Sequence, residues 1–197
     1  MRCAWFRIKN DQRAYQIAGV ASNVYQLSAE DLGCKIRVEV TPVDADAYHG
    51  TACGEFGPIA LDPAARQTLE YVLGTGGSQF PVAVLRPRGE EEAEAEEANL
   101  FVNAHVIKVC FAGGAEAIAL KYTIDYPRLE LHALDTQRFK IFYTEEKVDA
   151  KYEFDRCLEI RALSRQSRDL IALAIKCFSA HTYFINSKII ASVRVCW

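Results

Sequence analysis

The pattern of hydrophobic and polar positions contains one long helical signal, in residues 164–184. Apolar side chains recur there every three or four residues in two neighbouring rows, which is typical of a helix with one wide apolar face. The two rows consist of Leu170, Ala174, Cys177 and His181, and of Ile171, Ile175 and Phe178. Ser164 or Ser167 can cap the first turn, because a serine hydroxyl accepts a hydrogen bond from a free backbone N–H group. We therefore predict a C-terminal helix that lies against a sheet.

Most of the remaining pattern has the two-residue period of half-buried strands. Ile36, Val38 and Val40 alternate with polar residues, and further short strands are expected near Trp5 and at 51–56. In the second part of the chain, strands are predicted at 80–85, 101–111, 117–124, 129–134, 139–143 and 152–162.

The order of these elements predicts a mainly β protein with two small domains. Residues 1–62 form the first domain and residues 63–78 a linker. Residues 79–197 contain six or seven consecutive strands followed by one helix. That arrangement is typical of a pleckstrin-homology-like β-barrel with a C-terminal α-helix.

The net charge of −3 hides an uneven distribution of charged residues. Six acidic residues form one run, which we predict to be a solvated loop over residues 89–98. The run consists of Glu90, Glu91, Glu92, Glu94, Glu96 and Glu97. The rest of the chain is neutral to mildly basic, which is too weak a positive field to indicate nucleic-acid binding.

No constellation of catalytic or metal-binding residues stands out. The seven cysteines are widely spaced without a Cys-x-x-Cys pair, so we expect reduced, mostly buried thiols. Cys177 and His181 share a helix face at a spacing that metal ligands can use, but no second ligand pair accompanies them. Cys177 lies on an apolar stripe, whereas a catalytic thiolate needs an open, electropositive site.

The glycine-rich residues 74–78 lack the lysine of a phosphate-binding loop. We therefore predict that the chain is not an enzyme and holds no metal or cofactor. No apolar run approaches the roughly 18 to 20 residues that span a bilayer.

Residues 5–7 read Trp-Phe-Arg, residues 25–33 read Tyr-Gln-Leu-Ser-Ala-Glu-Asp-Leu-Gly, and residues 35–43 read Lys-Ile-Arg-Val-Glu-Val-Thr-Pro-Val. This series resembles one immunoglobulin-like repeat of the auxin-induced-in-root-cultures family. In that pattern a Trp begins a core strand, and a Tyr…Asp-x-Gly corner precedes a strand that ends near a Pro. The matching positions are Trp5, Tyr25, Asp31, Gly33 and Pro42. The resemblance implies an immunoglobulin-like β-sandwich in residues 1–62, with its first strand expected to be missing because little chain precedes the Trp.

Residues 128–141 and 167–178 resemble the C-terminal region of the same family, whose members are large microtubule-associated proteins. The resemblance implies a non-catalytic structural or docking module of a cytoskeleton-associated protein in the cytoplasm. Its partner would be a protein, either microtubules themselves or a microtubule-bound protein.

Direct contact with the acidic surface of a microtubule is expected to use basic side chains of the second domain. Arg165, Arg168 and Lys176 remain for the outer face of the predicted helix once its apolar rows are buried. We predict these three residues as partner-binding, against the simpler interpretation that they only keep the helix solvated.

The alternative function is that of a phosphoinositide-binding membrane adaptor. Many pleckstrin-homology-like barrels bind inositol phosphates through Lys and Arg side chains around their first strand pair. Arg86 and Arg88 lie at this place in the chain, but the six glutamates that follow them would repel a polyphosphate headgroup. The sequence therefore favours protein docking over lipid binding.

Overall fold

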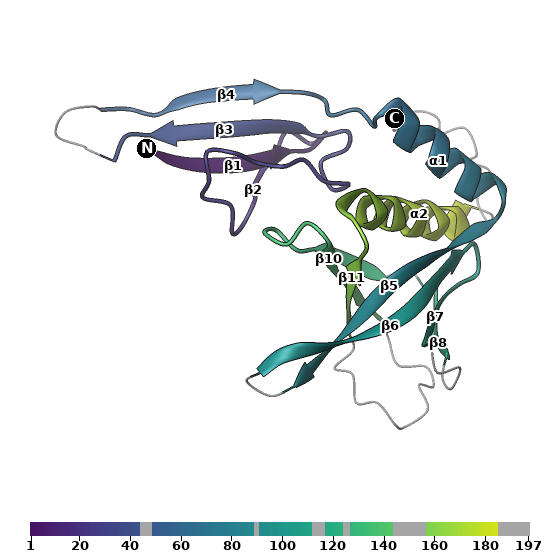
Figure 1. Cartoon of the computed structure of the whole chain (residues 1–197). Helices are drawn as coiled ribbons and strands as arrows, with labels where there is room; N and C mark the ends of the chain where they lie inside the picture. The colour runs from purple at the N-terminus through teal and green to yellow at the C-terminus, as the bar shows by residue number, and fades with distance from the viewer. Residues whose placement is uncertain (44–48, 89–90, 112–116, 124–126, 144–156, 185–197) are drawn as a thin grey trace. The chain divides into compact units, whose positions relative to one another are not determined.

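The computed structural model of the chain describes residues 1–43, 49–88, 91–111, 117–123, 127–143 and 157–184 (Figure 1). The chain divides into two compact units, the first within Met1–Asp62 and the second beginning at Pro63. Each unit has a β-sheet of its own.

The first unit contains a four-stranded antiparallel sheet in the part that the structure describes. Its strands are β1 (Arg2–Ile8), β2 (Ala14–Gln16), β3 (Lys35–Thr41) and β4 (Ala52–Phe56), in the order β2-β1-β3-β4. Trp5 lies opposite Val38, so both side chains belong to the same face of the sheet as the fully buried Ile36. The predicted strand of alternating residues around Val38 is therefore confirmed.

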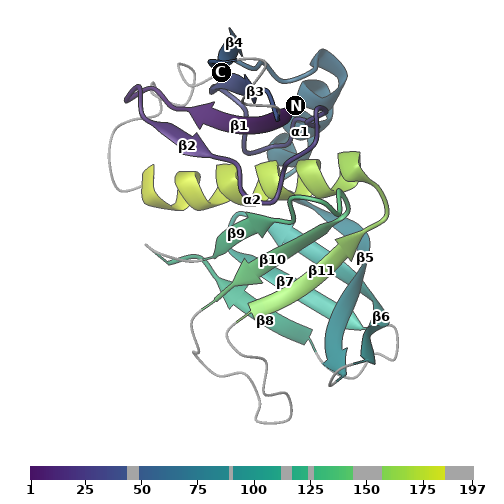
Figure 2. The ribbon, with the colours of Figure 1, turned by 90° about the vertical axis from the view of Figure 1, so that its left-hand side faces the viewer.

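The second unit contains a seven-stranded antiparallel sheet (Figure 2). Its strands are β5 (Gly77–Arg88), β6 (Glu91–Asn103), β7 (Val106–Phe111), β8 (Ala117–Lys121), β9 (Arg128–Leu131), β10 (Arg138–Phe142) and β11 (Cys157–Ala162). They pair in the order β8-β7-β6-β5-β11-β10-β9, so β11, the last strand of this unit, lies beside β5, its first strand. This order, followed by one helix, is that of a pleckstrin-homology-like domain.

The mainly β fold class is thus confirmed, with one correction to the expected barrel. Strands β8 and β9 end the sheet of the second unit, and no pairing joins them among the described residues. The sheet is therefore open rather than a closed barrel.

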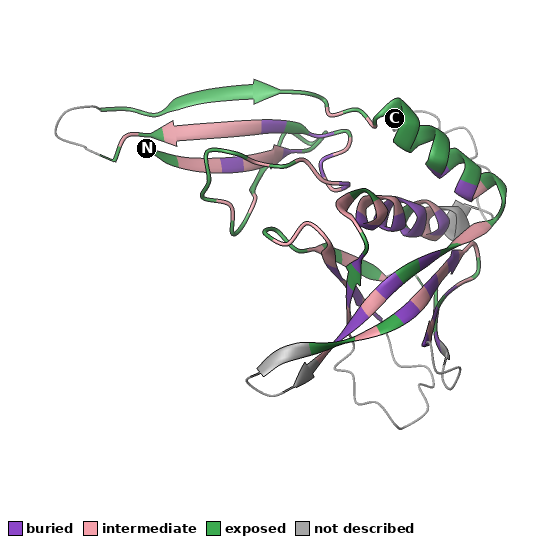
Figure 3. Cartoon of the chain, in the orientation of Figure 1, coloured by how far each residue is buried: buried purple, intermediate pink, exposed green. Residues whose placement is uncertain are grey.

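The predicted C-terminal helix is confirmed as α2 (Arg165–Phe184), which packs on β5, β6 and β11. Its apolar rows supply the buried residues Ile171, Ile175 and Phe178. Figure 3 draws the buried positions of the helix in purple. Each such side chain contributes about 1.5–3 kcal/mol through burial of apolar surface. On the sheet, the corresponding core is made of residues such as Leu100 and Ile160, which are fully buried.

Residues 63–78, which we expected to be a linker, instead form helix α1 (Pro63–Gly74) and the beginning of β5. Proline suits the first position of a helix, because its missing N–H group has no partner there in any case. Leu69 and Val72 are buried, and α1 packs against α2. Leu69 and Val72 are three residues apart, which matches the period of a helix. The composition of the segment alone is also compatible with a strand.

The acidic run is also not a loop in the part that the structure describes. Glu91–Asn103 is strand β6, and its pairing with β5 places Glu97 opposite Ala83 and Glu96 opposite Val84. Glutamate has a low intrinsic preference for strands, but this preference is small compared with the pairing and packing of a long hairpin. Residues 89 and 90 lie outside the described residues.

Candidate functional site

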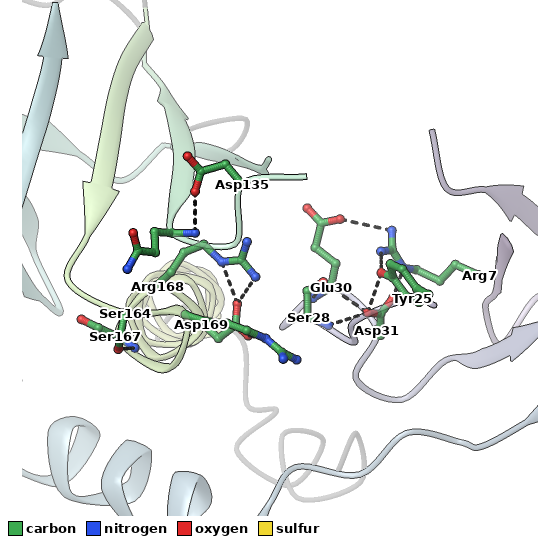
Figure 4. A network of polar contacts seen from close by, with 12 residues as sticks. Arg7, Tyr25, Ser28, Glu30, Asp31, Asp135, Ser164, Ser167, Arg168 and Asp169 are labelled. Carbon is green, nitrogen blue, oxygen red and sulfur yellow. Dashed lines mark hydrogen bonds and ion pairs between the residues drawn. The ribbon is translucent and has the colours of Figure 1, made fainter. Parts of the chain in front are cut away.

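The buried carboxylate of Asp31 is the centre of a polar cluster in the first unit (Figure 4). It accepts hydrogen bonds from Arg7 Nε at 2.7 Å, from Tyr25 Oη at 2.8 Å and from the backbone N–H of Ser28 at 2.6 Å. Arg7 also forms an ion pair with Glu30, at 3.1 Å from Nη1 to Oε2. A buried charge is tolerated only when it is paired and hydrogen-bonded in this way.

The cluster fixes the corner that precedes β3 onto strand β1. Trp5 packs against Tyr25 in a tilted arrangement, with 5.6 Å between ring centroids, and donates a 2.8 Å hydrogen bond from Nε1 to the carbonyl of Ser22. Gly33 has a φ of 75°, which is accessible to glycine at little cost, and its N–H donates to the carbonyl of Ile59 at 2.9 Å.

Burial, reinforced by Asp31, raises the pKa of Tyr25 to about 12, so the phenol keeps the proton that it donates. The Trp5, Tyr25, Asp31 and Gly33 positions of the sequence motif therefore come together in space. Their polar groups are engaged with one another, which makes this a structural cluster rather than a ligand site.

The predicted partner-binding residues lie on α2 in the second unit. Ser164 caps the helix, since its hydroxyl accepts a 3.1 Å hydrogen bond from the N–H of Ser167. Arg168, predicted for the outer face, is instead buried, and it donates from Nε and Nη2 to Asp169 Oδ1 at 3.0 and 2.8 Å (Figure 4). Position 168 precedes the buried Ile171 by three residues, so the helix turns both toward the same side. An arginine can occupy such a position by burying its aliphatic stem and pairing its charge.

The other two predicted residues are not buried. Arg165 is partly exposed, with Nε 3.9 Å from Asp169 Oδ2, and Lys176 is exposed. The rise of an α-helix places Lys176 about 16 Å further along the axis than Arg165. The structure therefore does not gather the three predicted residues into one site, and the partner role of Arg165 and Lys176 stays a prediction.

A turn that joins β9 to β10 is fixed to the segment just before α2. His132 Nδ1 accepts hydrogen bonds from the backbone N–H groups of Leu134 at 3.2 Å and Asp135 at 2.8 Å, which closes the turn. Gln137 Nε2 donates a 3.0 Å hydrogen bond to the carbonyl of Leu163. Two segments that are far apart in sequence are thus held side by side.

The two leucines of these segments are among the most exposed apolar side chains described. Arg161 and Arg165 lie two residues on either side of Leu163. We call these four residues, Leu134, Leu163, Arg161 and Arg165, the Leu134–Leu163 surface. The sequence pattern does not indicate this surface, because only the pairing of β10 with β11 brings its two segments together; the one sequence signal is a leucine in each of two polar turns.

The described residues contain no group of three or more His, Cys, Asp or Glu side chains that could hold a metal ion. Burial raises the pKa of the Cys177 thiol, and burial likewise raises that of Cys157. Both thiols therefore favour the protonated form, which is the opposite of an activated nucleophile. The side chain of His181 lies outside the described part, and none of the described helices is long and apolar enough to cross a membrane.

Arg86, which was considered only for the alternative of lipid binding, is engaged with the acidic strand. Its guanidinium forms an ion pair with Glu96 and lies over the ring of Phe111, 5.3 Å from the centroid. Arg88 is opposite Glu91 in the register of β5 and β6, and its side chain lies outside the described residues. The acidic strand thus supplies the carboxylate that pairs with Arg86.

Comparisons with known proteins agree with this division. Residues 2–55 match the family model of the AIR9 A9 domain, an immunoglobulin-like domain. The match lies within the first unit. No curated protein matches the sequence.

A solved structure with some similarity is the crystal structure of human RhoA in complex with the DH/PH fragment of PDZRHOGEF, at 14% identity and a TM-score of 0.36. The alignment covers 63% of this chain and 34% of that chain, so this chain spans about a third of its length. At this TM-score the likeness adds nothing to what the strand order of the second unit shows. The chain therefore combines an immunoglobulin-like unit with a pleckstrin-homology-like unit.

Proposed function

We propose that this chain is a non-catalytic docking module of a microtubule-associated protein, and that it works at the cytoskeleton in the cytoplasm. The observation that carries the proposal is the match of residues 2–55 to the AIR9 A9 domain. Resemblance of residues 128–141 and 167–178 to the C-terminal region of the same family supports it. Immunoglobulin-like and pleckstrin-homology-like folds commonly serve as interaction modules, although a fold alone does not define a function.

A docking role also suits the chemistry of the described side chains. The polar groups of the Asp31 cluster are committed to one another, and the partly buried thiols of Cys157 and Cys177 favour their protonated forms. On α2, the basic side chains of Arg165, which is partly exposed, and Lys176, which is exposed, are suited to long-range attraction of an acidic protein surface.

Lipid binding is the weaker candidate for a physical reason. Arg86 is already paired with Glu96, and Glu94 and Glu97 of the same strand are exposed. An anionic headgroup would have to displace a carboxylate and approach two others, which costs electrostatic free energy.

Co-sedimentation of the full chain with polymerised microtubules at low salt tests the proposal. A parallel experiment uses liposomes with and without phosphoinositide. We expect the chain to pellet with microtubules, to be released as salt rises past about 0.15 M, where charges are screened beyond about 8 Å, and to stay in the supernatant with both liposomes. Absence of pelleting with microtubules at low salt would overturn the proposal, and selective pelleting with phosphoinositide liposomes would replace it by the membrane adaptor.

A further inference from the structure

The Leu134–Leu163 surface of the second unit combines exposure with a fixed backbone. Leu134 is 72% and Leu163 68% exposed. A single exposed leucine is ordinary on a protein surface, whereas here two of them lie on segments that a hydrogen bond joins. Tyr71, which is 71% exposed on α1, is an isolated case by comparison.

Hydrogen bonds hold the two segments together without any partner. Besides the bond from the Gln137 side chain to the carbonyl of Leu163, the N–H of Ala162 donates to the carbonyl of Gln137 at 3.0 Å. His132 fixes the turn that carries Leu134. A docking surface whose backbone is already ordered loses little conformational entropy when a partner binds.

Two ion pairs lie near Leu163, and in each the arginine side chain is more exposed than the aspartate. Arg161 pairs with Asp135 at 3.6 Å, and the arginine side chain is 45% exposed against 31% for the aspartate. Arg165 pairs with Asp169 at 3.9 Å, with 39% exposure against 21%. In both pairs the guanidinium is more accessible than the carboxylate, and the N-terminal end of α2 adds its partial positive charge beside them.

From this combination we infer that the Leu134–Leu163 surface docks an acidic segment of a partner protein that also carries apolar side chains. The leucines would bury apolar side chains of the segment, and Arg161 and Arg165 would pair with its carboxylates. A second copy of this chain is a poor occupant, because a two-fold contact of the same surface would bring arginines face to face. The inference rests on the proposed function only in naming a protein as the partner.

A fluorescein-labelled synthetic peptide of alternating Glu-Glu-Leu units serves as the probe, and binding to the full chain is followed by fluorescence anisotropy. We expect saturable binding that the double variant Leu134→Ser, Leu163→Ser weakens about tenfold or more, as expected for the loss of central apolar contacts. The double variant Arg161→Glu, Arg165→Glu should weaken binding similarly and remove most of its salt dependence. Tyr71→Ser is the matched control, because it removes an equally exposed apolar side chain from the same unit and should leave binding unchanged.

Two control peptides separate the contributions, one with Ser in place of Leu and one with Lys in place of Glu, and both should bind more weakly. Equal binding of the parent and the leucine variant, or no saturable binding of the parent, would overturn the inference. Thermal unfolding of each variant must match that of the parent, since these side chains are exposed. Microtubule co-sedimentation reports separately on the proposed function. If the chain binds the peptide through the leucines but never pellets with microtubules, the docking inference stands and the proposed function is overturned.

Discussion

The phenol of Tyr25 donates a 2.8 Å hydrogen bond to the carboxylate of Asp31, and Arg7 donates to the same carboxylate from the side of β1 at 2.7 Å. Asp31 therefore links strand β1 to the corner that precedes β3. Because the carboxylate is completely buried, its partners replace the water that it loses on folding. Several properties of the first unit depend on this arrangement.

Replacement of Asp31 by Ala should destabilise the first unit by about 3–5 kcal/mol, because it leaves the guanidinium of Arg7 without its main partner in a partly buried place. Urea unfolding followed by tryptophan fluorescence measures the change. Asp11→Ala is the matched control: Asp11 is exposed and its contact with Arg13 is a surface ion pair, so the cost should stay within about 0.5 kcal/mol. Equal effects of the two variants would show that the Asp31 cluster does not stabilise the unit.

The raised pKa of Tyr25 predicts a stability change at high pH. Folding holds the phenolic proton more tightly than the unfolded chain does, so this contribution to stability is complete below about pH 10 and is lost as the pH rises toward about 12. A Trp197→Phe background leaves Trp5, which packs against Tyr25, as the sole fluorescent tryptophan. We expect the urea midpoint to fall between pH 9 and 11.5, and to fall less in Tyr25→Phe.

Tyr15→Phe provides the comparison for this experiment, since Tyr15 is exposed on β2. Its pH dependence should equal that of the parent. A parent midpoint that does not change up to pH 11.5 would contradict the predicted role of Tyr25.

Arg168 should behave as a core residue. Arg168→Glu places a carboxylate beside Asp169 in a buried position, so we expect the second unit to lose about 3–5 kcal/mol of stability. Differential scanning calorimetry measures the loss, with Lys176→Glu on the exposed side of the same helix as the control. If the Arg168→Glu variant melts like the parent, this arginine lies on the exposed outer face and is not a core residue.

Deletion of residues 90–97 should disrupt the second unit, because most of this segment is part of β6 and pairs with β5 along its length. The loss of the strand pairing also exposes the edge of β5, which otherwise lies between β6 and β11. We expect the deletion variant to lose cooperative unfolding in circular dichroism, while Glu94→Gln together with Glu97→Gln keeps it. A deletion variant with a normal transition would show that the acidic run is dispensable.

The features that sequence analysis predicted correctly have strong local signals. Helix α2 has two apolar rows over about three turns, and β3 alternates strictly, so in both cases local pattern and packing agree. The corner of Tyr25 and Asp31 was recognisable because its residues are close in sequence. These signals do not depend on knowing which distant segments meet.

The features that were missed depend on distant contacts. The acidic run becomes a strand because β5 is available as its partner, which overrides composition. Arg168 is buried because Asp169 neutralises it, a pairing that the apolar pattern does not reveal. The Leu134–Leu163 surface exists only once a side chain from one turn bonds to the backbone of another.

Arg165 and Lys176, neither of which is buried, carry the predicted microtubule contact of α2. Arg165→Glu together with Lys176→Glu changes the charge of the outer face by four units, so binding to an acidic microtubule surface should weaken at least tenfold at low salt. The melting curve should stay the same, since neither side chain is buried. Co-sedimentation at two salt concentrations measures the effect, and the difference between parent and variant should shrink at the higher salt as screening increases.

The matched control is Lys108→Glu together with Lys121→Glu, which makes the same change of charge on β7 and β8, away from α2. If the control weakens binding as much as the α2 variant, net charge rather than the α2 face governs the interaction. If the α2 variant pellets like the parent, the microtubule contact does not use α2.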